Sequence, residues 1–169
     1  MSLKPSYNIL FLCTGNSARS ILAEVYMNAR GGGRFRAFSA GSQPTGRVNP
    51  HAIETLRAAG LPVENLRSKS WDEFAAPGAP RMDFIITVCD NAAGEVCPVW
   101  PGHPASAHWP FEDPAAATGS EEAIRRKFAE VFAAIRQHID LLADLPPGNL
   151  DGQALRKKLA EIGEAGSPA

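Results

Sequence analysis

The sequence predicts an α/β fold, a small open sheet of four parallel strands with helices on both faces. Two observations support this prediction. Apolar, β-prone runs alternate with segments of helical periodicity along the chain, which is typical of parallel sheets. The first run, residues 7–12, is rich in Ile, Leu and Phe, as expected of a strand that is covered on both faces. A chain of 169 residues is long enough to bury the core of a single domain.

The first half of the chain contains two expected strands and three expected helices. The strands are at 7–12 and 35–40, and the helices are at 18–30, 49–60 and 70–74. Three consecutive glycines at 31–33 end the first helix, and apolar residues alternate with others in the second strand. Pro50 suits the first turn of the second helix, and Ser70 can cap the third.

The second half contains two further strands, a long helix and a helical tail. The expected elements are strands at 84–88 and 107–109, a long helix that Ser120 opens and Pro146 closes, and a short helix at 150–164 with Leu155, Leu159 and Ile162 on one face. Residues 90–104 carry two glycines and three prolines, so we expect a long loop, of the kind that often carries function. Residues 1–148 are the expected domain, and 149–169 a C-terminal helical extension and tail.

Composition and charge exclude several classes of function. Seventeen basic and 18 acidic residues give a net charge of −1, which argues against the basic surface that nucleic-acid binding needs. The sequence has no signal-peptide pattern and no apolar run long enough to span a bilayer. We therefore expect a cytoplasmic protein with no membrane partner. Three cysteines are an odd number and do not suggest a structural disulfide framework.

One stretch indicates chemistry, the run from Cys13 to Ser20. It lies between the first strand and the first helix, where backbone N–H groups favour an anion. A cysteine at this place is acidified and becomes a nucleophile, and the planar fork of Arg19 suits a tetrahedral oxyanion. We therefore expect thiolate attack on phosphate or a phosphate mimic. The expected oxyanion-binding residues are Thr14, Gly15, Asn16, Ser17, Ala18, Arg19 and Ser20.

Three residues of this run have expected supporting roles. Gly15 allows the backbone to approach a ligand closely, and Ser20 can donate a hydrogen bond to the thiolate. Asn16 can brace the loop, because its side chain binds neighbouring backbone and tolerates left-handed geometry. The alternative is an inert, buried cysteine, but the position of Cys13 between strand and helix favours the functional interpretation.

The run from Cys13 to Ser20, after its apolar strand, resembles the low-molecular-weight protein tyrosine phosphatase superfamily, which includes thiol-dependent arsenate reductases. The resemblance extends over residues 8–145 and includes Phe-Ser-Ala-Gly at 38–41 and Asp113-Pro114. It implies a phosphatase-like fold and identifies Cys13 and Arg19 as catalytic. It also implies that Asp113 donates the proton to the leaving group, a role that contributes about 10²–10⁴-fold in rate. Glu112 is the second choice, and a simple turn at Asp113-Pro114 is the alternative interpretation.

The resemblance to the arsenate reductases gives roles to Cys89 and Cys97. Cys89 would attack arsenate-bound Cys13 and release arsenite, and Cys97 would then attack Cys89 by thiol–disulfide exchange. Thioredoxin or a glutaredoxin-type reductant would reduce the final disulfide, so no cofactor is expected. The alternative interpretation treats Cys89 and Cys97 as two small buried apolar residues.

The sequence departs from the family pattern in two respects. Ala18 stands where many members have a second loop cysteine. Some reductases of this fold bind potassium, and Asn16, Glu24 and Ser39 resemble its ligands. The expected acidic ligand is missing near Lys69, whose charge would repel a cation, so no metal is predicted.

Two other functions remain open from the sequence. A protein tyrosine phosphatase needs only Cys13, Arg19 and Asp113 and would hydrolyse phosphomonoesters. A non-catalytic redox or oxyanion sensor would bind a partner protein through residues 90–104. We expect arsenate reduction, with arsenate or phosphate as the bound oxyanion.

Overall fold

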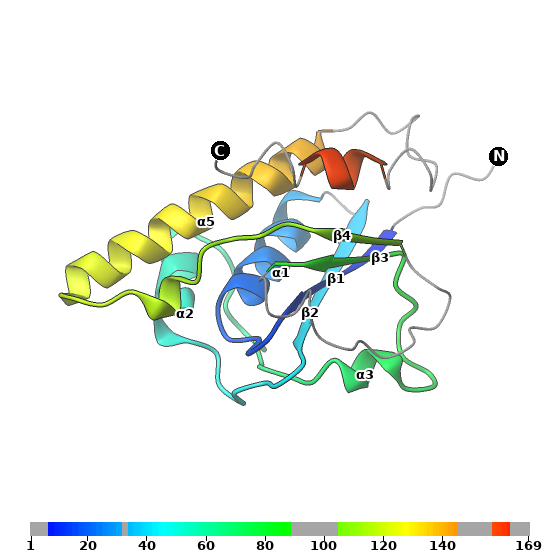
Figure 1. The fold of residues 1–169 in the computed structure, drawn as a ribbon, viewed down its shortest axis with the longest axis horizontal. Helices are drawn as coiled ribbons and strands as arrows, with labels where there is room; N and C mark the ends of the chain where they lie inside the picture. Colours follow the sequence, from blue (N-terminus) through cyan, green and yellow to red (C-terminus); the bar gives the residue numbers. More distant parts are fainter. Residues whose placement is uncertain (1–6, 32–33, 89–104, 145–156, 163–169) are drawn as a thin grey trace.

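The computed structural model describes residues 7–31, 34–88, 105–144 and 157–162. Its sheet contains β1 (Tyr7–Cys13), β2 (Phe35–Gly41), β3 (Phe84–Thr87) and β4 (Ala105–His108). The strand order is β2-β1-β3-β4, and all three pairings are parallel (Figure 1). The α/β prediction is confirmed.

Most element boundaries lie close to those expected. The helical elements with labels are α1 (Arg19–Arg30), α2 (Pro50–Ala58), α3 (Asp72–Ala75), the 3₁₀ turn η1 (Pro114–Ala116) and α5 (Glu121–Ala143). The predicted bounds of the fourth strand were wrong. Trp109 was expected to belong to this strand, but it follows β4. It is 1% exposed and packs in the core.

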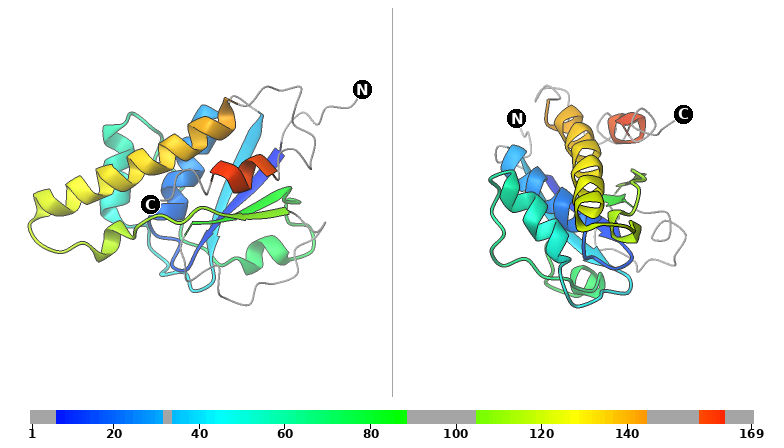
Figure 2. Two further views of the ribbon diagram at one scale, coloured as in Figure 1. Left: turned by 45° about the horizontal axis from the view of Figure 1, so that its top comes forward. Right: turned by 90° about the vertical axis from the view of Figure 1, so that its left-hand side faces the viewer.

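Helices cover both faces of the sheet, as predicted. Alternate residues of β1 point to opposite faces. Ile9 and Phe11 belong to the core beneath α1 and α5, while Leu10 packs on the other face with Phe74 of α3. Figure 2 shows α1, α2 and α5 together on one side of the sheet and α3 on the other.

Local sequence explains where the helices start. Asn49 accepts a hydrogen bond from the His51 N–H at 2.8 Å and precedes Pro50 at the first position of α2, a favourable start. Ser120 accepts from the Ala123 N–H at 3.1 Å and caps α5. In contrast, Ala18 provides no side-chain cap for α1, so the first N–H groups of α1 are available to an anion.

The C-terminal helical segment packs on the domain. Residues 157–162 are helical, and Leu159 and Ile162 are buried in the core that also contains Trp109. The Trp109 indole donates to the Leu159 carbonyl at 2.8 Å. The predicted helix is therefore confirmed over 157–162, whereas Leu155 lies outside the described residues, and the division at residue 148 stays a prediction. Across the described ranges, no helix has both the length and the apolar character required to cross a membrane.

Candidate oxyanion-binding site

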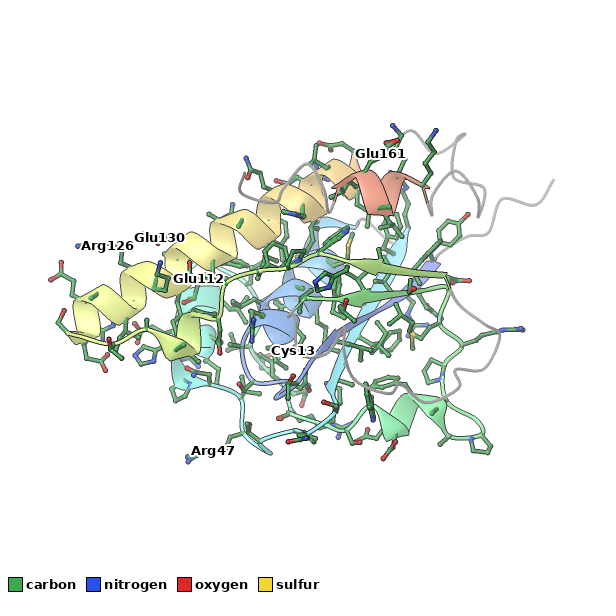
Figure 3. The ribbon with its side chains drawn as sticks, viewed as in Figure 1. Cys13, Arg47, Glu112, Arg126, Glu130 and Glu161 are labelled. Carbon is green, nitrogen blue, oxygen red and sulfur yellow. The ribbon has the colours of Figure 1, made fainter. Side chains whose placement is uncertain are left out.

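Cys13 ends β1 and begins the loop that leads into α1. The residue is 4% exposed and lies opposite Gly41, the last residue of β2. Figure 3 labels Cys13 at the C-terminal end of β1. A Cβ atom added to Gly41 would lie 2.5 Å from the Thr14 carbonyl oxygen and 3.0 Å from the Asn16 nitrogen. The loop can therefore reach this position only because residue 41 has no side chain.

Carbonyl groups of the loop point toward the segment after β2. Three of them accept backbone N–H groups from the segment after β2: Gln43 N–H to Thr14 O at 2.9 Å, Thr45 N–H to Gly15 O at 3.1 Å and Asn49 N–H to Ser17 O at 2.8 Å. In a planar trans peptide the N–H of the next residue points opposite to the carbonyl. The N–H groups of Gly15, Asn16 and Ala18 therefore point away from that segment, and together with the start of α1 they are available to an anion.

Asn16 braces the loop as predicted. It has a φ of 46° and is fully buried. Its side-chain oxygen accepts from the Lys69 N–H at 2.9 Å, and its amide donates to Ser20 Oγ at 2.8 Å. Because Ser20 Oγ accepts this bond, its own hydroxyl proton can be donated to a ligand or to the thiolate.

Arg19 connects the loop to the segment that contains Asp113. Its Nη1 donates to the Phe111 carbonyl at 3.0 Å, and its Nη2 lies 3.6 Å from Asp113 Oδ2. Asp113 Oδ1 also accepts from the Ala115 N–H at 2.9 Å and caps η1. The turn interpretation is therefore correct, but the same carboxyl also faces the guanidinium of Arg19.

Glu112 has a different environment. Its carboxylate lies 3.2 Å from Lys127 Nζ on α5, and its side chain is 66% exposed. Pairing with Glu112 raises the pKa of Lys127. Of the two carboxyl groups considered from the sequence, Asp113 is the one that the structure places against Arg19.

Cys89 and Cys97 lie outside the described residues. The described chain reaches Val88, whose N–H donates to the Leu12 carbonyl at 2.9 Å. Cys89 follows Val88 in the sequence, and Cys13 follows Leu12. Cys89 and Cys13 thus directly follow Val88 and Leu12, two residues that are hydrogen-bonded to each other.

Two of the three residues that resembled potassium ligands, Glu24 and Ser39, contact the ammonium group of a lysine. Lys69 Nζ lies 3.6 Å from Glu24 Oε1 and 3.4 Å from Ser39 Oγ, and Ser39 donates to Glu24 at 2.5 Å. The ammonium group therefore stands against the oxygens that a cation would need, and these residues do not fit a bound metal. The described residues include no cluster of three or more His, Cys, Asp or Glu side chains suited to a metal.

Several supporting contacts were not predicted from the sequence. Ser68 Oγ donates to the Gly15 carbonyl at 3.0 Å, and Gln43 and Thr45 bind the loop through their backbone. Backbone donors leave no residue-type signal. The Phe-Ser-Ala-Gly run at 38–41 entered the sequence analysis only through the family resemblance, and it contains Gly41, which the loop approaches closely.

Fold and site together define an α/β protein in which a cysteine ends the first strand and begins a loop that leads into the first helix. The chain matches the family described as "Low molecular weight phosphotyrosine protein phosphatase" over residues 8–160. This match spans most of the sequence, and the chain belongs to that family.

Curated relatives of the chain include bacterial arsenate reductases. The arsenate reductase of Bacillus licheniformis is 38% identical over 136 residues, which cover 80% of this chain and 94% of the relative. The arsenate reductase of Shouchella clausii is 34% identical over 156 residues, covering 92% of this chain and 96% of the relative. The second match therefore extends through nearly the whole length of both chains.

Solved structures with the same fold include both branches of the family. The arsenate reductase of Archaeoglobus fulgidus is 30% identical with a TM-score of 0.57, covering 78% of this chain and 98% of that one. A low molecular weight protein tyrosine phosphatase from T. tengcongensis is 23% identical with a TM-score of 0.65, covering 80% and 96%. The second likeness supports the fold alone.

Proposed function

We propose that this chain is a cytoplasmic arsenate reductase that uses Cys13 as its nucleophile. The observation that carries the proposal is the meeting of Arg19 and Asp113 beside the loop that begins at Cys13. The identity of 38% to an arsenate reductase over 80% of the chain supports arsenate as the substrate.

In the first step, the N–H groups of Gly15, Asn16 and Ala18 and the guanidinium of Arg19 hold the arsenate oxygens. The same N–H groups and the positive end of α1 stabilise the Cys13 thiolate. The thiolate attacks arsenic, so that an S–As bond forms and one As–O bond breaks. Asp113 donates a proton to the departing oxygen, which leaves as water.

In the second step, the thiolate of Cys89 attacks the sulfur of Cys13. An S–S bond forms, the S–As bond breaks and its electron pair stays on arsenic, which leaves as arsenite. The two thiols have then supplied the two electrons of the reduction. The Val88–Leu12 hydrogen bond supports this step, because it joins the residues that precede the two cysteines.

In the third step, Cys97 attacks Cys89, which restores the Cys13 thiolate and leaves a Cys89–Cys97 disulfide. A dithiol protein of the thioredoxin or glutaredoxin type reduces this disulfide by the same exchange chemistry.

Arsenate turnover with one reductant supplied at a time tests the proposal. We expect multiple turnovers with a thioredoxin-type dithiol and none for Cys13→Ser with any reductant. Absence of arsenite under every reductant, in a protein that binds phosphate, would contradict the proposal.

A phosphatase is the second candidate, because Cys13, Arg19 and Asp113 are sufficient for attack on a phosphomonoester. Rapid hydrolysis of aryl phosphates that is indifferent to Cys89→Ser and Cys97→Ser would favour it. Slow hydrolysis would not, since both reactions use the same loop.

A further inference from the structure

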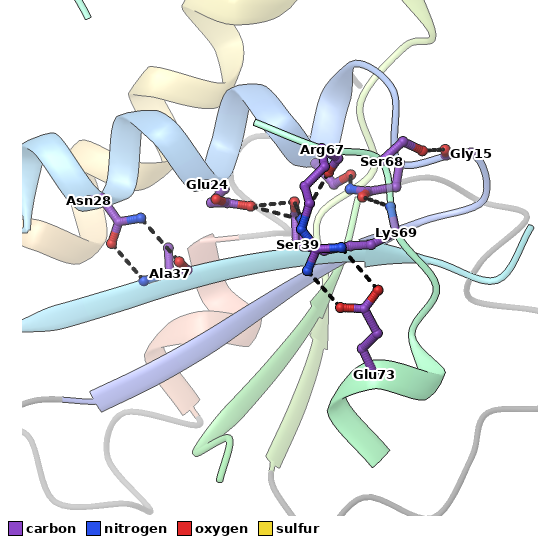
Figure 4. Close-up of polar contacts among 11 residues, drawn as sticks. Gly15, Glu24, Asn28, Ala37, Ser39, Arg67, Ser68, Lys69 and Glu73 are labelled. Carbon is purple, nitrogen blue, oxygen red and sulfur yellow. Dashed lines mark hydrogen bonds and ion pairs between the residues drawn. The ribbon is translucent and has the colours of Figure 1, made fainter. Parts of the chain in front are cut away.

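Lys69 places a positive charge inside a cage of three oxygens. Its Nζ donates to the Arg67 carbonyl at 3.0 Å and lies within 3.6 Å of Glu24 Oε1 and 3.4 Å of Ser39 Oγ. The Lys69 side chain is 9% exposed. Figure 4 shows the Glu24 contacts reaching from α1 to Ser39 on β2 and to Lys69. The ammonium group therefore links Glu24 of α1, Ser39 of β2 and the backbone of Arg67.

The same segment holds the oxyanion loop through its backbone. The Lys69 N–H donates to Asn16 Oδ1 at 2.9 Å, and the Lys69 carbonyl accepts from the Gly41 N–H at 2.9 Å. Since Asn16 in turn donates to Ser20, the position of Lys69 determines how this part of the loop is braced. Anchoring the ammonium fixes the backbone that contacts Asn16.

The charge of Lys69 also offsets that of Glu24. The Glu24 side chain is 20% exposed, and Glu24 lies on α1, the helix into which the anion-accepting loop leads. A carboxylate with no partner cation at this position would oppose oxyanion binding, because like charges repel strongly where water is largely excluded. Burial lowers the pKa of Lys69, while the Glu24 carboxylate acts in the opposite direction.

We propose that Lys69 is a positioning residue whose ammonium group takes the place that a monovalent cation would otherwise fill between Glu24 and Ser39, and so holds the backbone that braces the oxyanion loop. The cage consists of a carboxylate, a hydroxyl and a carbonyl, which are oxygen ligands that hard cations prefer. An ammonium group and a potassium ion have similar size. The protein is therefore independent of exchangeable monovalent cations, and it becomes dependent on them when the ammonium is removed.

Two substitutions separate charge from volume. Lys69→Ala removes both, and so leaves room in the cage for a potassium ion. Lys69→Met removes the charge but fills much of the space. Lys158→Ala is the matched control, because it removes a lysine that pairs with Glu161 at 3.4 Å with its side chain 55% exposed.

The experiment measures phosphate affinity by calorimetry at constant ionic strength, in potassium chloride and in tetramethylammonium chloride. Wild type and Lys158→Ala should bind equally well in both salts. In tetramethylammonium, Lys69→Ala should bind about tenfold more weakly, the size expected for a lost charge-assisted hydrogen bond. Potassium should restore most of that loss in Lys69→Ala and none in Lys69→Met.

The inference rests on the proposed function only in taking residues 13–20 as the oxyanion loop. Phosphate binding by the wild type tests the proposed function separately from the role of Lys69. Failure of wild type to bind phosphate would contradict the proposed function itself. If wild type binds, then unchanged affinity in Lys69→Ala, a loss that potassium does not repair, or equal rescue of Lys69→Met would overturn the role of Lys69. If Lys69→Ala does not fold, a wild-type affinity that differs between the two salts would still overturn it.

Discussion

Arg19 is the residue at which the two parts of the site meet. It starts α1 at the end of the loop, and its guanidinium contacts both the Phe111 carbonyl and Asp113. The neighbouring Glu112 is instead paired with Lys127. The structure thus gives the two adjacent carboxyl groups different partners, and Asp113, the first choice from the resemblance, is the one beside Arg19.

Asp113→Asn and Glu112→Gln form a matched pair. The amide introduced by Asp113→Asn would keep the cap on η1 but could not donate a proton as a carboxylic acid does, so we expect kcat for arsenate reduction to fall about 10²-fold or more. Glu112→Gln should leave kcat within about twofold, because an exposed ion pair contributes little. Steady-state kinetics at saturating arsenate measure both. The reverse order of effects would assign the acid to Glu112.

Gly41→Ala should reduce phosphate affinity as well as stability. The new Cβ would overlap the Thr14 carbonyl at 2.5 Å, so we expect a loss of about 1–3 kcal/mol in unfolding free energy and clearly weaker phosphate binding. Gly60→Ala is the control: Gly60 has a φ of +76° with open space around it, so strain should reduce stability without reducing phosphate affinity. Denaturant unfolding and calorimetry measure the two quantities, and intact affinity in Gly41→Ala would contradict the close approach.

At the scale of elements, α5 packs against the segment that leads to Asp113. His138 of α5 is 3% exposed, with its ring centroid 4.7 Å from that of Phe111 and 5.4 Å from that of Trp109. Its Nδ1 lies 2.9 Å from the Ala134 carbonyl. Burial lowers the pKa of His138, so folding disfavours the protonated form of this ring.

This burial predicts a pH dependence of stability. Unfolded histidine has a pKa of about 6.5, so below that pH the unfolded chain binds a proton that folded His138 resists. The contribution of His138 is therefore present above pH 6.5 and is lost as the pH falls towards its lower folded pKa. Denaturant unfolding of wild type and His138→Gln between pH 7.5 and 5 should show a shallower decline in the variant. Parallel curves would contradict this.

Element types followed from local patterns, whereas the bounds of the fourth strand did not. The Asn49-Pro50 and Ser120 starts were readable because a capping side chain acts within its own helix. Trp109 was misassigned to a strand because an apolar residue after a short strand has the same local pattern whether it extends the strand or turns into the core. Its neighbours in space, Phe11 and His138, are distant in sequence.

At the scale of the whole molecule, the parallel sheet explains why separate segments form one site. The carboxyl ends of parallel strands share one edge, so Cys13 and the segment leading to Asp113 could be placed together from the sequence. The role of Lys69 could not, because its charge alone suggested only repulsion of a cation. Its contacts with Glu24 and Ser39 depend on a chain path that no local pattern specifies.

The central claim is a thiol relay that starts at Cys13, and Cys97→Ser tests it most directly. Reduced Cys97→Ser, mixed with arsenate without added reductant, should release one arsenite per chain and then stop. Mass mapping should find Cys13 joined to Cys89, whereas wild type under the same conditions should end with Cys89 joined to Cys97. Sustained turnover by Cys97→Ser with a thioredoxin-type reductant at the wild-type rate, or release of arsenite with no Cys13–Cys89 disulfide, would contradict the relay.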